Sequence, residues 1–153
     1  CDYRWLVVKL VSVYDADLEL AATTLWDLLT SRPAVANISH KSMPTWQEHL
    51  AFIASRPYPI WYLIDGPVEL SEVGYISGFI GSIYLTRNNE IGLGILESYR
   101  GRGYGSAALG MFMRLHPRDR YLAHVAPANL QGQAFWLKHG FKPLQVTYEF
   151  RFE

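Results

Sequence analysis

The sequence predicts a mixed α/β fold in one domain over residues 1–153, with a central, mostly antiparallel sheet of six to seven strands and helices on both faces. The length is typical of a single domain, and half of the residues are hydrophobic, which is enough to build a core. The order of the segments decides the class: a strand, two helices and an antiparallel meander of about three strands precede a strand–helix–strand–helix–strand run.

The first half of the chain is expected to supply a strand, two helices and two further strands. β-branched and aromatic residues near the N-terminus are typical of a strand, and leucines and alanines at helical spacing then predict a helix. Thr45, followed three residues later by Glu48, predicts the capped start of another helix. The next strand should end at Asp65-Gly66. These segments lie at residues 3–14, 15–29, 45 onward, 59–64 and 73–85.

The second half of the chain is expected to contain a parallel β-α-β unit. Asn88-Asn89 predicts a hairpin turn, after which apolar residues alternate with glycines as in a strand. A later helix carries Leu130, Ala134 and Leu137 on one face and should end at Gly140. A strand–helix–strand crossover of this kind is right-handed and its strands are parallel. The elements lie at residues 90–96, 105–116, 121–125 and 129–139, with one or two closing strands at 141–153.

A glycine-rich loop, SYRGRGYGSAALG at residues 98–110, lies between the first strand and the helix of that unit. A Walker A motif is excluded because no Lys follows at the required position, and a Rossmann fingerprint would need glycine where Ser106 stands. The remaining spacing is R-x-x-G-x-G, made by Arg100, Gly103 and Gly105. Amides of such a strand-to-helix loop converge on one spot and can hold a phosphate. A plain turn with solvated arginines is the alternative.

Two motifs together resemble the GNAT superfamily of acetyl-CoA-dependent N-acetyltransferases. The first, EIGLGILESYRGRGYGSAAL, is similar to the family's central strand, pyrophosphate loop and following helix. The second, NLQGQAFWLKHGF at residues 129–141, is similar to its later helix. The resemblance covers about residues 60–145. It implies a GNAT-like fold in which the parallel central pair of strands splays around the cofactor.

The resemblance implies a site for acetyl-CoA (coenzyme A) as co-substrate. The central strand would pair with pantetheine, an amide near Ile95 would donate to the thioester carbonyl, and the glycine loop would hold the pyrophosphate. Asn129 would contact the other side of the cofactor, and a plain N-cap is its alternative role. The expected cofactor-binding residues are Leu93, Ile95, Leu96, Arg100, Gly101, Arg102, Gly103, Tyr104, Gly105, Ser106, Asn129 and Trp136.

Amine acetylation needs a base, because an alkylammonium group must lose a proton before its nitrogen can attack. Glu90 resembles the catalytic Glu of some family members, and His124 is the second candidate. The alternative role of Glu90 is an ordinary solvated carboxylate. The alternative role of His124 is a half-buried histidine whose hydrogen bonds are already satisfied. Many family members protonate the leaving thiolate with a Tyr where this sequence has Trp136, and an indole is not a useful acid. Tyr104 or Tyr121 could substitute.

Composition narrows the class of partner. Fourteen basic and fourteen acidic residues cancel, so no basic footprint for nucleic acid is present. One cysteine and scattered histidines give no metal-ligand spacing, so no metal is expected. No apolar run is long enough to span a membrane, and no signal peptide is visible. We therefore expect a cytoplasmic protein without a membrane partner.

The expected function is transfer of acetyl from acetyl-CoA to a primary amine of a small molecule, by direct attack in a ternary complex. The protein would be a monomer or a homodimer. The acceptor stays open, with an amino sugar or another metabolite as candidates. Two alternatives remain: a protein or peptide N-acetyltransferase of the ribosomal-protein type, and a non-catalytic acyl-CoA-binding regulatory domain. An amine screen that follows thiol release separates the enzyme from the regulatory domain.

Overall fold

A four-stranded antiparallel sheet forms the centre of the fold in the computed structural model, which describes residues 8–31, 43–70 and 74–152. Strands that are consecutive in the sequence are neighbours in this sheet, so its order is β1-β2-β3-β4. Each described pair is antiparallel, as expected for a meander. The strands are β1 (Lys9–Ser12), β2 (Ile60–Leu70), β3 (Gly74–Leu85) and β4 (Ile91–Ile95).

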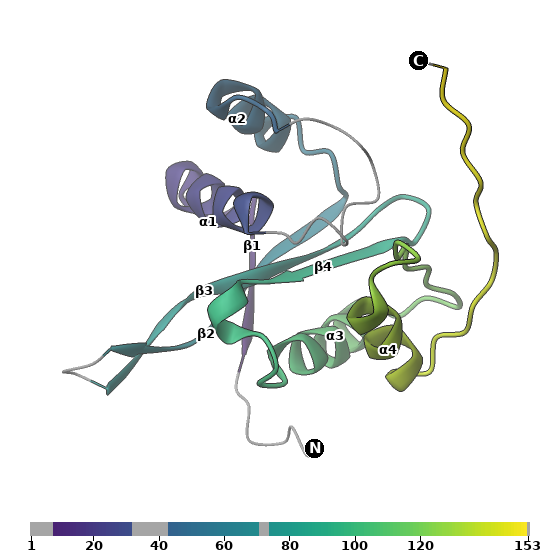
Figure 1. Cartoon of the computed structure of the whole chain (residues 1–153). Coiled ribbons are helices and arrows are strands. Elements are labelled where there is room, and N and C mark those ends of the chain that lie inside the picture. Colours follow the sequence, from purple (N-terminus) through teal and green to yellow (C-terminus); the bar gives the residue numbers. More distant parts are fainter. Residues whose placement is uncertain (1–7, 32–42, 71–73, 153) are drawn as a thin grey trace.

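Helices lie on both sides of this sheet (Figure 1). On one side are α1 (Leu18–Thr30) and α2 (Trp46–Ala54), and on the other are α3 (Tyr104–Leu115) and α4 (Leu130–Lys138). A short 3-10 helix, η2 (Glu97–Tyr99), joins β4 to α3. The mixed α/β class with helices on both faces is therefore confirmed.

Each face of the sheet carries its own apolar core. Successive residues of a strand point to opposite faces, so β2 places Ile64 in the core beneath α3 and Leu63 in the core beneath α1. Phe112 of α3 and Ala22 of α1 are buried in these two cores. Burying a side chain of the size of Leu or Phe stabilises a fold by about 1.5–3 kcal/mol. Together the cores fix the sheet that carries β4.

The predicted helices and their end signals are confirmed. The Thr45 hydroxyl accepts a hydrogen bond from the Glu48 amide at 3.1 Å, and the Glu48 carboxylate accepts one from the Thr45 amide at 3.0 Å. This is the predicted capping box at the start of α2. The hydrogen bond from the Thr45 amide also lowers the pKa of the Glu48 carboxyl. At the end of α4, Gly140 has a φ of +87°, which fits its predicted role as a stop.

The predicted end of the second strand at Asp65-Gly66 is wrong. β2 continues through both residues as far as Leu70, and Asp65 pairs with Lys9 on one side and Phe79 on the other. The register between β2 and β3 shifts between Ile64 and Asp65. A bulge of this kind takes up the local bend without ending the ladder, so a turn-like dipeptide stays inside the strand.

Two predicted strand regions near the C-terminus do not form ladders. Residues 121–125 contribute one isolated parallel bridge, between Leu122 and Glu90. Residues 141–152 are extended, and no strand is assigned to them. Among the described residues the sheet therefore has four strands, where six to seven were expected. Residues 3–7 of the first predicted strand lie outside the described part of the chain.

Glycines allow β3 and β4 to approach each other closely. A Cβ atom added at Gly81 of β3 would lie 2.3 Å from the carbonyl oxygen of Gly94 and 3.2 Å from the Cα of Ile95. Both are backbone atoms, so the strands would have to move apart. A Cβ added at Gly94 would meet the end of the Leu28 side chain at 3.4 Å, which is close to ordinary contact.

Replacing Gly81 by alanine should therefore destabilise the protein much more than the same change at Gly94. We expect Gly81→Ala to lower the free energy of unfolding by about 1–3 kcal/mol, the usual cost of overpacking. Gly94→Ala should cost under about 1 kcal/mol, because Leu28 can shift. Urea unfolding followed by circular dichroism measures both values. Equal losses would show that the close approach at Gly81 is not the constraint.

Candidate cofactor and catalytic site

β4 is hydrogen-bonded to β3 along one edge over most of its length, and beyond Ile91 no described strand pairs with its other edge, where the Ile95 carbonyl accepts a hydrogen bond from the Arg100 side chain. Alternate residues of an antiparallel strand direct their amides to opposite edges. The Leu96 amide, just past β4, donates to the Ile80 carbonyl of β3 at 2.8 Å, so the amides of Leu93 and Ile95 face away from β3. Among the described residues, these two amides have no acceptor. Leu93 and Ile95 are thus placed for the predicted pairing with pantetheine, whereas the Leu96 amide is already used.

The open edge of β4 meets residues 121–125 at one point. The Ile91 amide donates to the Leu122 carbonyl at 2.8 Å, and the Leu122 amide donates to the Asn89 carbonyl at 2.8 Å. These bonds surround the parallel bridge between Glu90 and Leu122. In the described part of the chain, the two segments make no further pairing toward the C-terminal end of β4. They meet and then separate, as expected for a splayed parallel pair.

The loop after β4 is held by one arginine and shaped by two glycines. The Arg100 Nε atom donates to the Ile95 carbonyl at 2.8 Å, so this side chain binds the end of the strand. Gly101 and Gly103 have φ angles of +74° and +89°, a region that favours glycine. The Arg102 guanidinium lies 5.7 Å from the centre of the Tyr99 ring. The two glycines carry no side chain that would cover the loop backbone. The Arg100 side chain attaches the loop to the end of β4.

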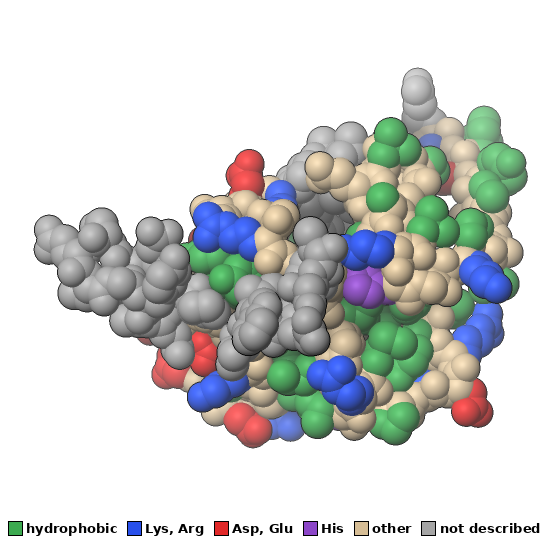
Figure 2. Space-filling view, turned by 90° about the horizontal axis from the view of Figure 1, so that it is seen from below, with side chains coloured by type: hydrophobic (Ala, Val, Ile, Leu, Met, Phe, Trp, Pro, Cys, Tyr) green, Lys and Arg blue, Asp and Glu red, His purple; other side chains and the backbone are tan. Residues whose placement is uncertain are grey.

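α3 begins directly after this loop and leaves three amides for an external acceptor. Gly103 is the N-cap, so no side chain accepts hydrogen bonds from the first turn, and that turn has no acidic residue. The amides of Tyr104, Gly105 and Ser106 have no partner within the helix. A helix N-terminus of this kind attracts an anion by about 0.3–1 kcal/mol through its dipole. In Figure 2, Lys and Arg side chains are scattered over the face that carries α3 and α4.

The first turn of α3 packs against α4. A Cβ added at Gly105 would lie 3.4 Å from the Phe135 ring, close to ordinary van der Waals contact, so α3 and α4 touch at this point. The Ser106 hydroxyl and His139 Nε2 are 2.8 Å apart, and Ser106 is buried. Sequence analysis missed this contact, because 33 residues separate its two partners and no pattern links them. It fixes the position of the amide-bearing turn.

Asn129 and Trp136 of the second motif have structural partners. The Asn129 side chain accepts a hydrogen bond from the Gly132 amide at 2.9 Å, so Asn129 caps α4. The Trp136 ring packs between Phe135 and Phe141, at centroid distances of 5.1 and 4.8 Å. A role for either residue toward a cofactor stays a prediction.

The two candidate bases are brought together. Glu90 Oε2 and His124 Nε2 are 3.2 Å apart, and the Glu90 side chain is half-buried while that of His124 is more exposed. The Glu90 backbone is fixed on both sides: its amide donates to the Thr86 hydroxyl at 3.1 Å and its carbonyl accepts from the Thr86 amide at 2.9 Å. The pair lies where β4 and residues 121–125 meet.

The two tyrosines considered as substitute acids are occupied elsewhere. Tyr104 is buried in the core beneath the sheet, where its ring contacts Tyr99 edge-on. The Tyr121 hydroxyl donates to the His116 carbonyl at the end of α3 and accepts from the Arg118 amide at 3.0 Å. The Tyr121 hydroxyl is therefore engaged at the end of α3, and the Tyr104 ring is packed in the core.

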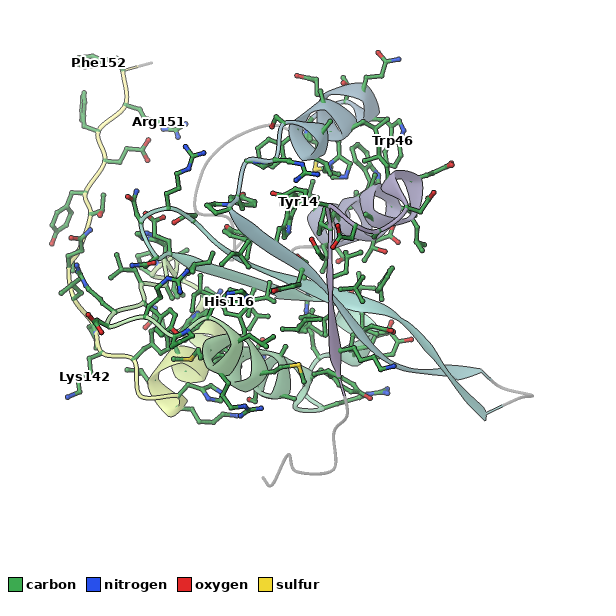
Figure 3. The ribbon with its side chains drawn as sticks, turned by 180° about the vertical axis from the view of Figure 1, so that it is seen from behind. Tyr14, Trp46, His116, Lys142, Arg151 and Phe152 are labelled. Carbon is green, nitrogen blue, oxygen red and sulfur yellow. The ribbon has the colours of Figure 1, made fainter. Side chains whose placement is uncertain are left out.

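The surroundings of two half-buried histidines favour the neutral imidazole by lowering its pKa. Burial lowers the pKa of His139, and the neighbouring Lys138 lowers it further. Burial, helped by Arg118, likewise lowers the pKa of His116, which lies 2.7 Å from the Tyr62 hydroxyl beneath the sheet. Figure 3 shows His116 on the α3 side of the sheet.

The open strand edge, the amide-rich loop and the splayed pair agree with the comparisons to known proteins. The sequence matches the Acetyltransferase (GNAT) family over residues 24–141. The chain belongs to the GNAT acetyltransferase family. No curated protein sequence matches the chain significantly. Among the described residues, no helix of this GNAT chain could cross a membrane, and no group of three or more His, Cys, Asp or Glu could hold a metal.

Several solved structures share this GNAT fold at low sequence identity. A domain from Methanocaldococcus jannaschii is 18% identical with a TM-score of 0.70, and 94% of each chain is covered. Aminoglycoside N-acetyltransferase AAC(6')-Iy in complex with CoA is 15% identical with a TM-score of 0.62, covering 99% of this chain and 98% of that one. The acetyl-CoA complex of yncA from Salmonella typhimurium is 15% identical with a TM-score of 0.57, covering 89% and 79%.

The histidine contacts predict a loss of stability in mild acid. The folded-state pKa of His139 and of His116 lies below the value near 6.5 of an unfolded chain, so the unfolded state binds protons first as the pH falls through 6.5. Each histidine should then cost under about 1 kcal/mol between pH 7.5 and 5.5, because both rings stay partly solvated. Urea unfolding at the two pH values measures this, and His139→Gln should reduce the difference. A pH-independent stability would contradict it.

Proposed function

We propose that this chain is an N-acetyltransferase that moves an acetyl group from acetyl-CoA to a primary amine of a small molecule. Membership of the GNAT family supports the acetyl transfer. Two fold neighbours have CoA or acetyl-CoA in their structures, which supports acetyl-CoA as the donor. AAC(6')-Iy is also described with a bisubstrate analogue that joins CoA to an acetylneamine, which supports direct transfer within a ternary complex and a small amine as acceptor.

One observation carries the proposal: the open edge of β4 is followed directly in the chain by the amides at the start of α3. The amides of Leu93 and Ile95 lie on the open edge, and those of Tyr104 to Ser106 point out of the first turn of α3. An extended donor molecule with an amide-containing arm and a diphosphate needs these two kinds of partner in this order. In this arrangement the Ile95 amide would stabilise the oxyanion that forms on the thioester, an effect worth roughly 3–4 kcal/mol.

Glu90 and His124 supply the proton acceptor in this proposal. The amine nitrogen attacks the thioester carbonyl carbon, a C–N bond forms, and the C–S bond breaks as the sulfur leaves with its electron pair. The proton lost from the nitrogen passes to the Glu90–His124 pair through water molecules, because Ile95 lies at the far end of β4, five residues beyond Glu90. The thiolate is a tolerable leaving group at neutral pH, since thiols have a pKa near 8.5. No side-chain acid is required, which suits a chain with Trp136 in the place of the family's Tyr.

The first test of the proposal is an amine screen with the purified protein. Acetyl-CoA should raise the melting temperature, and thiol release should follow when the correct amine is added. The panel includes aminoglycosides, amino sugars, polyamines and peptides with free amino groups. Cys1 contributes at most one thiol per chain, so release beyond that is turnover. Binding without turnover on any amine would favour the regulatory alternative, and turnover on peptides alone would favour the protein N-acetyltransferase.

Gly103→Asp should abolish the binding of acetyl-CoA. The added carboxylate would lie at the N-terminus of α3, repel the diphosphate and compete for the same amides, and Gly103 has a positive φ that a side chain strains. We expect affinity to fall at least about 100-fold, which corresponds to roughly 2.7 kcal/mol. Isothermal calorimetry with acetyl-CoA measures it.

Gly103→Ala is the matched control for that experiment. Alanine tolerates the positive φ no better than aspartate does but adds no charge, so a clearly smaller loss of affinity isolates the effect of the carboxylate. Equal affinities of the aspartate variant and the unchanged protein would remove this loop from the proposed donor site.

Glu90→Gln should leave acetyl-CoA binding intact and reduce kcat about 100-fold or more, because an amide cannot accept the proton while its shape is nearly the same. Steady-state thiol release with the best amine from the screen measures kcat. Asp119→Asn removes another carboxylate, from an exposed position, and serves as the control with unchanged kcat. Unchanged turnover in Glu90→Gln would remove Glu90 from the mechanism.

A further inference from the structure

The face of β4 that is turned toward α1 and α2 carries few side chains of its own. Successive residues of a strand point to opposite faces, and the two isoleucines and the leucine of β4 pack in the core beneath α3. The opposite face is left to Glu90 and the two glycines, Gly92 and Gly94. Because the α3 side is filled, an amine that attacks a thioester held at the open edge of β4 is expected to approach from the side of α1 and α2 (Figure 1).

Tyr84 of β3 covers this glycine face of β4. Tyr84 and Gly92 are partners in the register of the two strands, so their side-chain positions lie on the same face of the sheet. A Cβ atom added at Gly92 would overlap the ring carbons and the hydroxyl oxygen of Tyr84. The ring therefore reaches from β3 across to β4, and its hydroxyl end lies over Gly92, where any larger residue would displace it.

The ring of Tyr84 is held by a neighbouring ring, whereas its hydroxyl is not bonded. The Tyr58 ring stacks on it, with the two centroids 3.8 Å apart and the planes inclined by 3°. Trp61 of β2, which is buried, meets the Tyr58 ring edge-on at a centroid distance of 4.9 Å. In the part of the chain that the structure describes, the Tyr84 hydroxyl has no hydrogen-bond partner, and Tyr84 is only half-buried. A substrate or a water molecule can therefore bind this hydroxyl without displacing a protein group.

The Tyr84 hydroxyl lies between the two ends of the proposed reaction. Strand residues advance about 3.4 Å each, so Gly92 lies roughly 7 Å from Glu90 and roughly 10 Å from Ile95 along β4. The proton lost from an amine beside Ile95 has to cross this interval to reach the pair of Glu90 and His124. A phenol hydroxyl both accepts and donates a hydrogen bond, so it can carry a proton across part of that path.

We propose that the Tyr84 hydroxyl is a further catalytic group, which relays the proton from the attacking amine toward Glu90 and His124. The inference rests on the proposed function. The hydroxyl oxygen takes the proton from the amine nitrogen as its own proton passes to a water molecule on the Glu90 side. One O–H bond breaks as another forms, so the phenol is unchanged after each turnover. The stack with Tyr58 keeps the hydroxyl in place for this transfer.

Tyr84→Phe tests the relay, because it removes the hydroxyl and keeps the ring that stacks on Tyr58. We expect kcat to fall about 10- to 100-fold in steady-state thiol release with the best amine from the screen, while calorimetry gives an unchanged affinity for acetyl-CoA. Tyr62→Phe removes a hydroxyl from the other face of the same sheet, where it contacts His116, and is the matched control with unchanged kcat. The melting temperature confirms that both variants fold.

A double variant separates a relay from a structural role. If Tyr84 acts by passing protons to Glu90, Tyr84→Phe should cost nothing further in a protein that already carries Glu90→Gln. The double variant and Glu90→Gln alone should therefore have the same kcat. Losses that multiply would overturn the relay, because they would show that the two residues act independently.

Failure of the relay and failure of the proposed function give different results. Turnover that is the same in Tyr84→Phe as in the unchanged protein would overturn the relay and leave the proposed function standing. An unchanged protein that turns over no amine would overturn the proposed function, and the relay with it.

Discussion

The site depends on one constraint: β4 is paired along one edge and left open along most of the other. The close approach of β3 at Gly81 holds the paired edge. The cores on the two faces of the sheet hold β4 in the plane. A strand with full ladders on both sides would have no amides to offer, and a strand without β3 would have no fixed position. The single bridge at Glu90 marks the point from which the edge becomes available.

The proposed proton acceptor lies at the same point. Because Glu90 immediately precedes β4, the backbone that closes the hairpin through Thr86 also fixes the carboxylate next to His124. The proposed proton acceptor, Glu90, lies one residue before β4, and the proposed oxyanion donor at Ile95 is the last residue of that strand. α3 and its preceding loop are attached to the end of the same strand through Arg100. The proposed reaction is therefore arranged along a single continuous segment of the chain.

Local signals in the sequence predicted the helices, their caps and the glycine loop, since each depends on residues a few positions apart. The Thr45–Glu48 capping box and the stop at Gly140 are examples. Long-range pairing was less predictable. The bulge that carries β2 through Asp65 depends on two neighbouring strands, and the contact between Ser106 and His139 depends on how α4 packs. The closing strands expected at residues 141–153 are not formed over residues 141–152, because a strand needs a pairing partner that the local sequence does not specify.

The side chain of Arg100 links the two ends of the proposed donor site, the glycine loop and the end of β4. The hydrogen bond from its Nε atom to the carbonyl of Ile95 ties the loop to the end of the strand. In the proposed site, the separation between the loop amides for a diphosphate and the Ile95 amide for a thioester would then be set by the protein and not by the ligand. The proposed site would therefore discriminate by the length of the donor molecule, because an acyl carrier with a shorter or longer arm than pantetheine could reach the loop amides or Ile95 but not both.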